Sequence, residues 1–323
     1  MKNLQTLSVL LLTLFFTNNT YAKIWRVNNT AGVVADFTDL QSAHNAAVAG
    51  DTIHVEPSVS NYTSLTLTKR LVIIGNGYLL TIDTGLQANT NNSAVASGIT
   101  FNPGSSGSTI QGLTLAYYTY VEDSNITIRR CFIQYPVYVY SSKFTFVNNY
   151  IYNYGVSEQV GNLTGINISN NIFYYYSGIT FGSTSTGNFT NNTCNASGIS
   201  CYNFQVNNNI LLGGSFAATN NVYFNNISDG TLFGTANGNQ QNVTGASMFT
   251  QTGAYNTHDA YWVLKGGSPA IGAGYGGVDC GAFGGPNPYH LAGIPSVPTI
   301  YKLTVPPVGT TNINVTISTR SNN

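Results

Sequence analysis

Apolar and polar residues follow a repeated pattern through the middle of the chain. An apolar residue, an anchor residue three positions later and a second apolar residue two positions after that recur around Leu113, Cys131, Asn149, Asn171, Asn192 and Asn209. The steps between these anchors are 18, 18, 22, 21 and 17 residues. A repeat of about twenty residues cannot bury its own apolar face, so the copies must stack and share one core.

Strand and helix patterns precede the repeats. Residues 23–27 and 52–55 read as strands, and residues 37–48 read as a short amphipathic helix between them. Two further strand-like runs follow at 65–68 and 71–77. This order closely resembles the N-terminal cap and first coils of right-handed parallel β-helix proteins of the pectate-lyase-like superfamily. The resemblance implies an all-β fold, a single right-handed parallel β-helix whose helical cap covers the open N-terminal end.

The period fades after residue 236. The run YWVLKGGSPAIG at 261–272 resembles the segment that ends many bacterial β-helices, and residues 311–318 alternate as an edge strand. We therefore expect the β-helix with its N-terminal cap over 23–236, and the last coils, a C-terminal cap and a tail over 237–323. The chain as a whole resembles exported β-helix proteins of Bacteroidetes-type bacteria whose function is unassigned.

The first 22 residues have the features of a secretory signal peptide. Lys2 precedes an apolar run at 7–16, and small residues at 20–22 form a cleavage site. No later run reaches the roughly 18 apolar residues of a membrane span, and the first cysteine is Cys131, which excludes an N-terminal lipid-anchored cysteine. We expect a secreted or cell-surface protein without a membrane span.

The composition of the chain limits its possible partners, indicates that it folds and bears on its disulfides. Charged residues make up only 7% of the chain and the net charge is zero, so nothing indicates binding to nucleic acid or anionic membranes. Aromatic residues make up 12%, which favours a folded chain over a disordered one. Cys194 and Cys201 could pair, but Cys194 falls at a core position, so we expect no obligatory disulfide.

The asparagine anchors have two interpretations. Asparagine tolerates positive φ at a bend between strands, and stacked asparagine side chains can hydrogen-bond from coil to coil. The same amides could instead donate hydrogen bonds to a sugar. We favour the structural ladder.

Candidate catalytic residues are few. Enzymes with this fold mostly act on polysaccharides, and hydrolases need paired carboxylates across the scissile bond. Glu122 lies nine residues after Leu113 and Glu158 nine after Asn149, so we expect them at one repeat position, about 10 Å apart across two coils. Arg130 is a weak candidate base. The alternative is that these are solvated turn residues.

Metal and cofactor chemistry has little support in the sequence. The four histidines are scattered, without ligand spacing, and no nucleotide-binding or nucleophile motif stands in a suitable context. We expect no cofactor and no side-chain metal site. Ca²⁺ held by backbone carbonyls would leave no sequence trace.

Tyrosines recur three to five positions after the anchors. The candidate ligand-binding set is Tyr117, Tyr118, Tyr135, Tyr152, Tyr154, Tyr174, Tyr175 and Tyr176. Rings with hydroxyl tips suit stacking on sugar rings in water. A ladder of rings that stabilises the stacking of coils is the alternative.

The leading functional hypothesis is an exported, non-catalytic β-helix protein that binds glycan or another extended polymer through a tyrosine-rich face. A polysaccharide lyase or glycoside hydrolase acting in a groove is the first alternative, and a structural or adhesive surface protein is the second. The sequence contains no signal for the oligomeric state.

Overall fold

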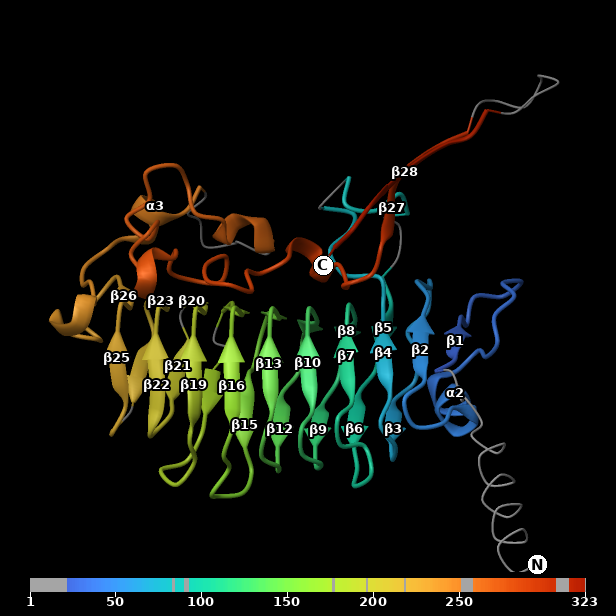
Figure 1. Cartoon of the computed structure of the whole chain (residues 1–323), viewed down its shortest axis with the longest axis horizontal. Helices are drawn as coiled ribbons and strands as arrows, with labels where there is room; N and C mark the ends of the chain where they lie inside the picture. The colour runs from blue at the N-terminus through green and yellow to red at the C-terminus, as the bar shows by residue number, and fades with distance from the viewer. Residues whose placement is uncertain are drawn as a thin grey trace, which may run out of the picture.

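The computed structural model describes residues 22–82, 85–89, 93–175, 178–195, 197–217, 219–250, 258–305 and 314–322 of the 323-residue chain. They form a right-handed parallel β-helix of about nine turns, shown from the side in Figure 1. The predicted all-β parallel β-helix is therefore confirmed. The expected signal peptide lies almost entirely in residues 1–21, outside the described residues.

Three parallel sheets, which we name A, B and C, form the sides of the β-helix. Sheet A contains β1 (Ile24–Val27), β2 (Thr52–Val55), β4 (Val72–Ile74), β7 (Thr109–Gln111), β10 (Thr127–Arg129), β13 (Thr145–Val147), β16 (Ile166–Ser169), β19 (Gly187–Thr190), β22 (Phe204–Asn207) and β25 (Val222–Phe224). Sheet B contains β5 (Val95–Ala96), β8 (Thr114–Leu115), β11 (Phe132–Ile133), β14 (Tyr150–Ile151), β17 (Ile172–Phe173), β20 (Thr193–Asn195), β23 (Ile210–Leu212) and β26 (Ile227–Ser228). Sheet C contains β3 (Leu65–Leu67), β6 (Ile99–Phe101), β9 (Thr119–Val121), β12 (Val137–Val139), β15 (Val156–Glu158), β18 (Gly178–Thr180), β21 (Gly198–Ser200) and β24 (Ser215–Ala217).

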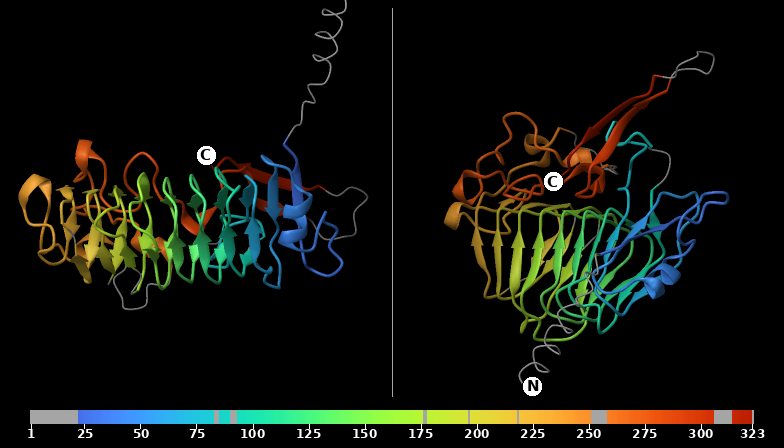
Figure 2. Two further views of the ribbon diagram at one scale, coloured as in Figure 1. Left: turned by 90° about the horizontal axis from the view of Figure 1, so that it is seen from below. Right: turned by 45° about the vertical axis from the view of Figure 1, so that its right-hand side comes forward.

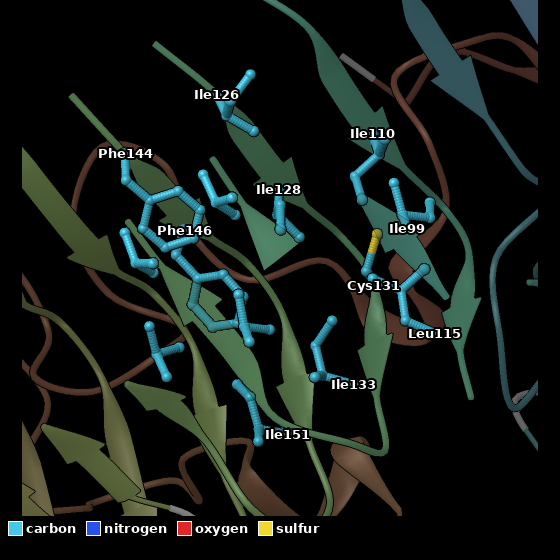
Figure 3. Packing of buried hydrophobic residues seen from close by; sticks show 14 of the residues in the cluster. Ile99, Ile110, Leu115, Ile126, Ile128, Cys131, Ile133, Phe144, Phe146 and Ile151 are labelled. Atoms are coloured by element: carbon cyan, nitrogen blue, oxygen red, sulfur yellow. The ribbon is translucent and has the colours of Figure 1, made fainter. Parts of the chain in front are cut away.

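The apolar positions of the repeat stack in register inside the coils. In sheet A, Ile110 pairs with Ile128, which pairs with Phe146, and all three are fully buried. In sheet B, Ile133 pairs with Ile151 in the same way. Figure 3 shows these side chains converging from neighbouring coils. The sequence repeat therefore corresponds to one coil, and its apolar positions form the shared core.

A short helix, α2 (Leu40–Ala46), lies at the N-terminal end of the stack and contacts β1, β2 and β3. Asp39 caps it, because its carboxylate accepts a hydrogen bond from the Ser42 backbone N–H at 2.8 Å. Leu40 and Ala43 are fully buried in the main core. The helix is shorter than the predicted 37–48, and its role as a cap stays a prediction.

The asparagine anchors form a buried ladder along the turn between sheets A and B. The Oδ1 atom of Asn192 accepts hydrogen bonds from the backbone N and the Nδ2 of Asn171, both at 3.0 Å. The Nδ2 of Asn192 donates to Ile168 O at 3.0 Å and to Asn209 Oδ1 at 3.1 Å. The same pattern links the asparagines 149, 171, 192, 209, 226 and 239 in order. The structural interpretation of the asparagine anchors is confirmed.

After the last coil the chain turns back along the stack. Two short helices come after β26 in the chain, η1 (Ala236–Gly238) and α3 (Gly245–Met248). Three more lie within residues 258–297: η2 (Asp259–Trp262), η3 (Tyr275–Gly277) and η4 (Leu291–Gly293). We call residues 258–297 the return segment. In Figure 1 it extends from the β25 end towards β4, over the coils.

On six successive coils, the residue before a ladder asparagine or before the anchor Cys131 holds the return segment. Five of these residues are asparagines with positive φ, between 53° and 60°, and Arg130 has φ of 51°. From the last coil backwards, the contacts are Asn225 to Ala273 O, Asn208 to Tyr275 N, Asn191 to Asp279 O, Asn170 to Ala282 O and Gly284 O, Asn148 to Asn287 O, and Arg130 to Ile294 O. Adjacent residues on each coil therefore serve two ladders, one buried and one holding the return segment.

The return segment also buries the outer face of sheet B. Tyr150, Ile172 and Ile210 point outward from sheet B and pack in a second apolar cluster with Trp262 and Cys280. Sheet B is thus covered on both faces, which is ordinary for parallel sheets. All four cysteines are buried free thiols, as expected from the core position of Cys194.

The described chain closes with an antiparallel hairpin of β27 (Thr299–Thr304) and β28 (Thr316–Arg320). Figure 2 shows it projecting away from the coils. The edge strand expected at 311–318 is found at 316–320, and residues 311–313 lie outside the described residues. Within the described residues, no helix has the length and apolar character needed to span a membrane.

Candidate functional site

Six tyrosines gather on three successive coils, at the turn between sheets B and C and on the outer face of sheet C. They are Tyr117, Tyr118, Tyr120, Tyr135, Tyr138 and Tyr154, and we call them the tyrosine cluster. Tyr120 and Tyr138 stand on β9 and β12 in direct register, while the other four lie in the turns that lead into β9, β12 and β15. The parallel stacking of coils brings together residues that lie almost 40 positions apart in sequence.

The rings of the cluster form a row along the axis of the β-helix. The ring centroids of Tyr117 and Tyr135 are 5.3 Å apart, and those of Tyr135 and Tyr154 are 5.7 Å apart with an interplanar angle of 21°. Tyr118 connects this row to sheet C, because its ring stacks on Tyr138 at 5.8 Å and 13°. These separations lie in the range in which aromatic pairs attract each other.

The cluster is accessible at its ends and carries no charge. Tyr117 is 52% exposed and Tyr154 49% exposed, and the rings between them are partly covered by their neighbours. The three segments that carry the cluster, 116–121, 134–139 and 152–157, contain no charged residue. Burial raises the pKa of the Tyr118 phenol, and the neighbouring phenols of Tyr138 and Tyr117 add to that effect, so the hydroxyl stays protonated.

The other candidate tyrosines lie elsewhere. Tyr174 is buried under the return segment, with its ring centroid 6.3 Å from that of Trp262. Tyr152 and Tyr175 pack against Tyr174 and keep 39% and 46% of their surface exposed. Tyr176 lies outside the described residues. The predicted set therefore divides into the tyrosine cluster and a second group beside the return segment.

Sequence reasoning missed Tyr120 and Tyr138, although a signal for them exists. In the runs TYV and VYV the tyrosine stands between residues that face the core. Alternation with a period of two places such a residue on the outer face of its strand. The two residues lie seven positions after the anchors Leu113 and Cys131, beyond the three to five positions at which the predicted tyrosines recur.

The expected pairing of Glu122 and Glu158 at one repeat position is wrong. Val139 pairs with both Val121 and Glu158, so Glu158 shares the register of Val121 rather than that of Glu122. The cause is one extra residue between the anchor and sheet C: Val156 comes seven residues after Asn149, whereas the earlier coils need six. The insertion falls at Tyr154, which has φ of 65°.

The three catalytic candidates do not share one corner of the coils. The Glu158 carboxylate accepts hydrogen bonds from Gly182 N at 2.6 Å and Ser185 Oγ at 2.7 Å, which fixes the following coil. Glu122 is exposed just after β9. Arg130 is 3% exposed, follows sheet A and donates to the backbone of the return segment. Their catalytic role stays a prediction, and the coils do not bring Arg130 to the same turn as the two glutamates.

Among the described residues, no group of three or more histidine, cysteine, aspartate or glutamate side chains is arranged to hold a metal ion. Binding of Ca²⁺ by backbone carbonyls stays untested by this observation.

Comparison of the chain with protein-family models, with curated protein sequences and with solved structures gave no match.

Proposed function

We propose that this protein is exported to the cell surface or the medium, where its β-helix binds an extended, uncharged polysaccharide without cleaving it. The tyrosine cluster carries this proposal. It is the aromatic surface that spans three coils while leaving its end rings open to solvent.

The direction of the ring row supports a polymer rather than a single sugar. Tyr117, Tyr135 and Tyr154 follow one another along the axis, and coils repeat at about 4.8 Å. A sugar chain lying parallel to the axis meets ring faces and hydroxyl edges over the whole row. Rigid aromatic side chains lose little conformational freedom on binding, which favours affinity.

The charge of the site supports an uncharged ligand. Acidic polysaccharides need arginine or lysine for carboxylate recognition. The segments 116–121, 134–139 and 152–157 supply hydroxyls, amides and rings instead. Discrimination against a polyuronate is therefore expected from this surface.

The test compares the wild-type protein with the double variant Tyr117→Ser/Tyr154→Ser. Binding to soluble xylan, mixed-linkage glucan and polygalacturonate is measured by affinity electrophoresis and calorimetry. We expect binding to a neutral polymer, and weakening of at least about tenfold in the variant, since truncation of an important aromatic contact costs more than about 1 kcal/mol and two such contacts are removed.

Tyr275→Ser is the matched control, because Tyr275 is 72% exposed and belongs to the return segment. It should leave binding unchanged. Binding that survives in the double variant, or binding to polygalacturonate alone, contradicts the proposal. Absence of binding to every polymer favours a structural or adhesive role, and shortened products after incubation favour an enzyme.

A further inference from the structure

A cavity of about 320 Å³ opens where the return segment meets the end of β28. It is lined by Leu86, Tyr289, His290, Leu291, Ile294, Arg320, Ser321 and Asn322. This volume lies at the lower end of the range of small-molecule sites, and the lining combines apolar surface with convergent polar groups, as such sites do.

Three arginines surround this cavity. Arg320 lines it directly and donates from Nη2 to Leu86 O at 2.7 Å. Arg130 donates from Nη1 to two residues of the lining, Ile294 O at 2.9 Å and Asn322 O at 3.0 Å. Arg129 donates from Nη2 to Ser296 Oγ at 2.8 Å, two residues beyond Ile294. Arg320 thus lines the cavity, Arg130 is bonded to two lining residues, and Arg129 is bonded to a residue beside the cavity.

Each of these arginines keeps a buried donor without an acceptor. The Nε atoms of Arg129, Arg130 and Arg320 are inaccessible to solvent and have no hydrogen-bond partner. A buried N–H that lacks an acceptor costs about 1–3 kcal/mol, and more when the group is charged. The guanidinium groups of this region are therefore incompletely satisfied by hydrogen bonds within the protein.

The three arginines have no carboxylate partner within the described part of the chain. Among the described residues, no carboxylate forms an ion pair with any of the three arginines. Burial lowers the pKa of Arg130 to about 10, and the charge of Arg129 adds to the effect. Burial, followed by the charges of Arg130 and Arg129, lowers the pKa of His290 to about 4. The buried carboxylate of Asp259 is bonded to the lining residue Tyr289, since its Oδ2 accepts hydrogen bonds from Tyr289 Oη at 2.9 Å and from Ala292 N at 2.7 Å. Its Oδ1 has no hydrogen-bond partner, but it is not paired with any of the three arginines.

We propose that this cavity binds a small oxyanion, either phosphate or the carboxylate of a small organic acid, in direct contact with Arg320. Arg129 and Arg130 supply positive charge nearby, and Ser321 supplies a hydroxyl donor at the wall. An oxyanion in the cavity would accept charge-assisted hydrogen bonds from the Arg320 guanidinium and would offset the positive charge of the neighbouring arginines. This site is independent of the tyrosine cluster, so its test and that of the polysaccharide site fail or succeed separately.

The test is calorimetric titration of the purified full chain with sodium phosphate, sodium glucuronate and, as the uncharged analogue, glucose, at constant ionic strength in sodium chloride. Saturable binding of phosphate or glucuronate is expected, with no binding of glucose. Stronger binding of phosphate identifies a phosphate-type ligand, and stronger binding of glucuronate identifies an acidic sugar.

Two variants locate the ligand. Arg320→Gln should weaken binding at least tenfold, and Ser321→Tyr should abolish it by filling the mouth of the cavity with all three arginines intact. Arg70→Gln, a change at an exposed arginine outside the cavity, should leave it unchanged. Hydrogen exchange across β27 and β28 verifies that the hairpin persists in each variant. Binding of neither anion, or equal binding by wild type, Arg320→Gln and Ser321→Tyr, overturns the proposal.

Discussion

At the scale of the residue, asparagine has two separate roles in each coil. The first asparagine of a pair such as Asn191–Asn192 adopts positive φ, which few other residues tolerate, and its amide reaches the return segment. The second is buried and bonds to the coils on both sides. The sequence predicted the buried ladder because Asn–Asn pairs recur at the coil period. It could not predict the first role, since the partners lie about 50 to 140 residues away.

Substitution Asn192→Ala should be among the most destabilising changes in the β-helix. It removes the acceptor of two donors on Asn171 and the donor to Ile168 O, and it leaves these groups buried. At about 1–3 kcal/mol per unsatisfied group, we expect a loss on the order of 3–5 kcal/mol in the free energy of unfolding, measured by urea denaturation. The control is Asn188→Ala on the preceding strand, β19, where the side chain is exposed. Equal stability of the two variants would show that the ladder is energetically neutral.

At the scale of the element, the strands were predictable and the course of the return segment was not. Alternation and the coil period located the strands of sheet A and the core-facing residues of sheet B. The outward residues of sheet B carry a further signal in the sequence: in Tyr150–Ile151 and Ile172–Phe173 two consecutive residues are large and apolar. A strand with two apolar faces indicates a covered sheet. The segment that covers sheet B is held through its backbone groups, within residues 273–294. No sequence pattern identifies these groups.

The attachment of the return segment can be tested with Asn170→Gly. Glycine keeps the positive φ of this position but removes the amide that donates to Ala282 O at 3.0 Å and Gly284 O at 2.7 Å. Loss of two hydrogen bonds, at about 1 kcal/mol each, should speed local hydrogen exchange in residues 279–287 by about tenfold or more. Asn162→Gly is the control, since Asn162 also has positive φ and is exposed. Unchanged exchange in Asn170→Gly would mean that apolar packing alone holds the segment.

At the scale of the whole molecule, the histidines should make the free energy of unfolding decrease as the pH falls. Burial lowers the pKa of His44, His54 and His290 below the ordinary value, for His290 to about 4. The unfolded chain therefore binds more protons than the folded chain between about pH 6.5 and 4, and stability rises with pH over that window. For Glu56 burial acts to raise the pKa, but hydrogen bonds from Arg26 and Asn28 outweigh it, so its contribution is lost only at more acidic pH.

The prediction is that the free energy of unfolding falls as the pH decreases from 6.5 to 4. His290 is partly solvated, so its share is discounted for solvent screening to about 1–2 kcal/mol. The variant His290→Gln should show a flatter pH profile over this window in urea unfolding curves. A profile of His290→Gln parallel to that of the wild type would contradict the assignment.

The return segment can dock correctly only if the coils that it contacts have formed in the right number and register. Its contact points meet six successive coils in reverse order, from Asn225 to Arg130. A coil left unformed or paired out of step displaces the later docking positions by one coil spacing, about 4.8 Å. The return segment can therefore make all of its contacts only with a stack in which every one of these coils is formed and in register. The last step of folding therefore depends on the number and register of these coils, and a missing or misregistered coil among them would prevent the C-terminal part of the chain from docking fully.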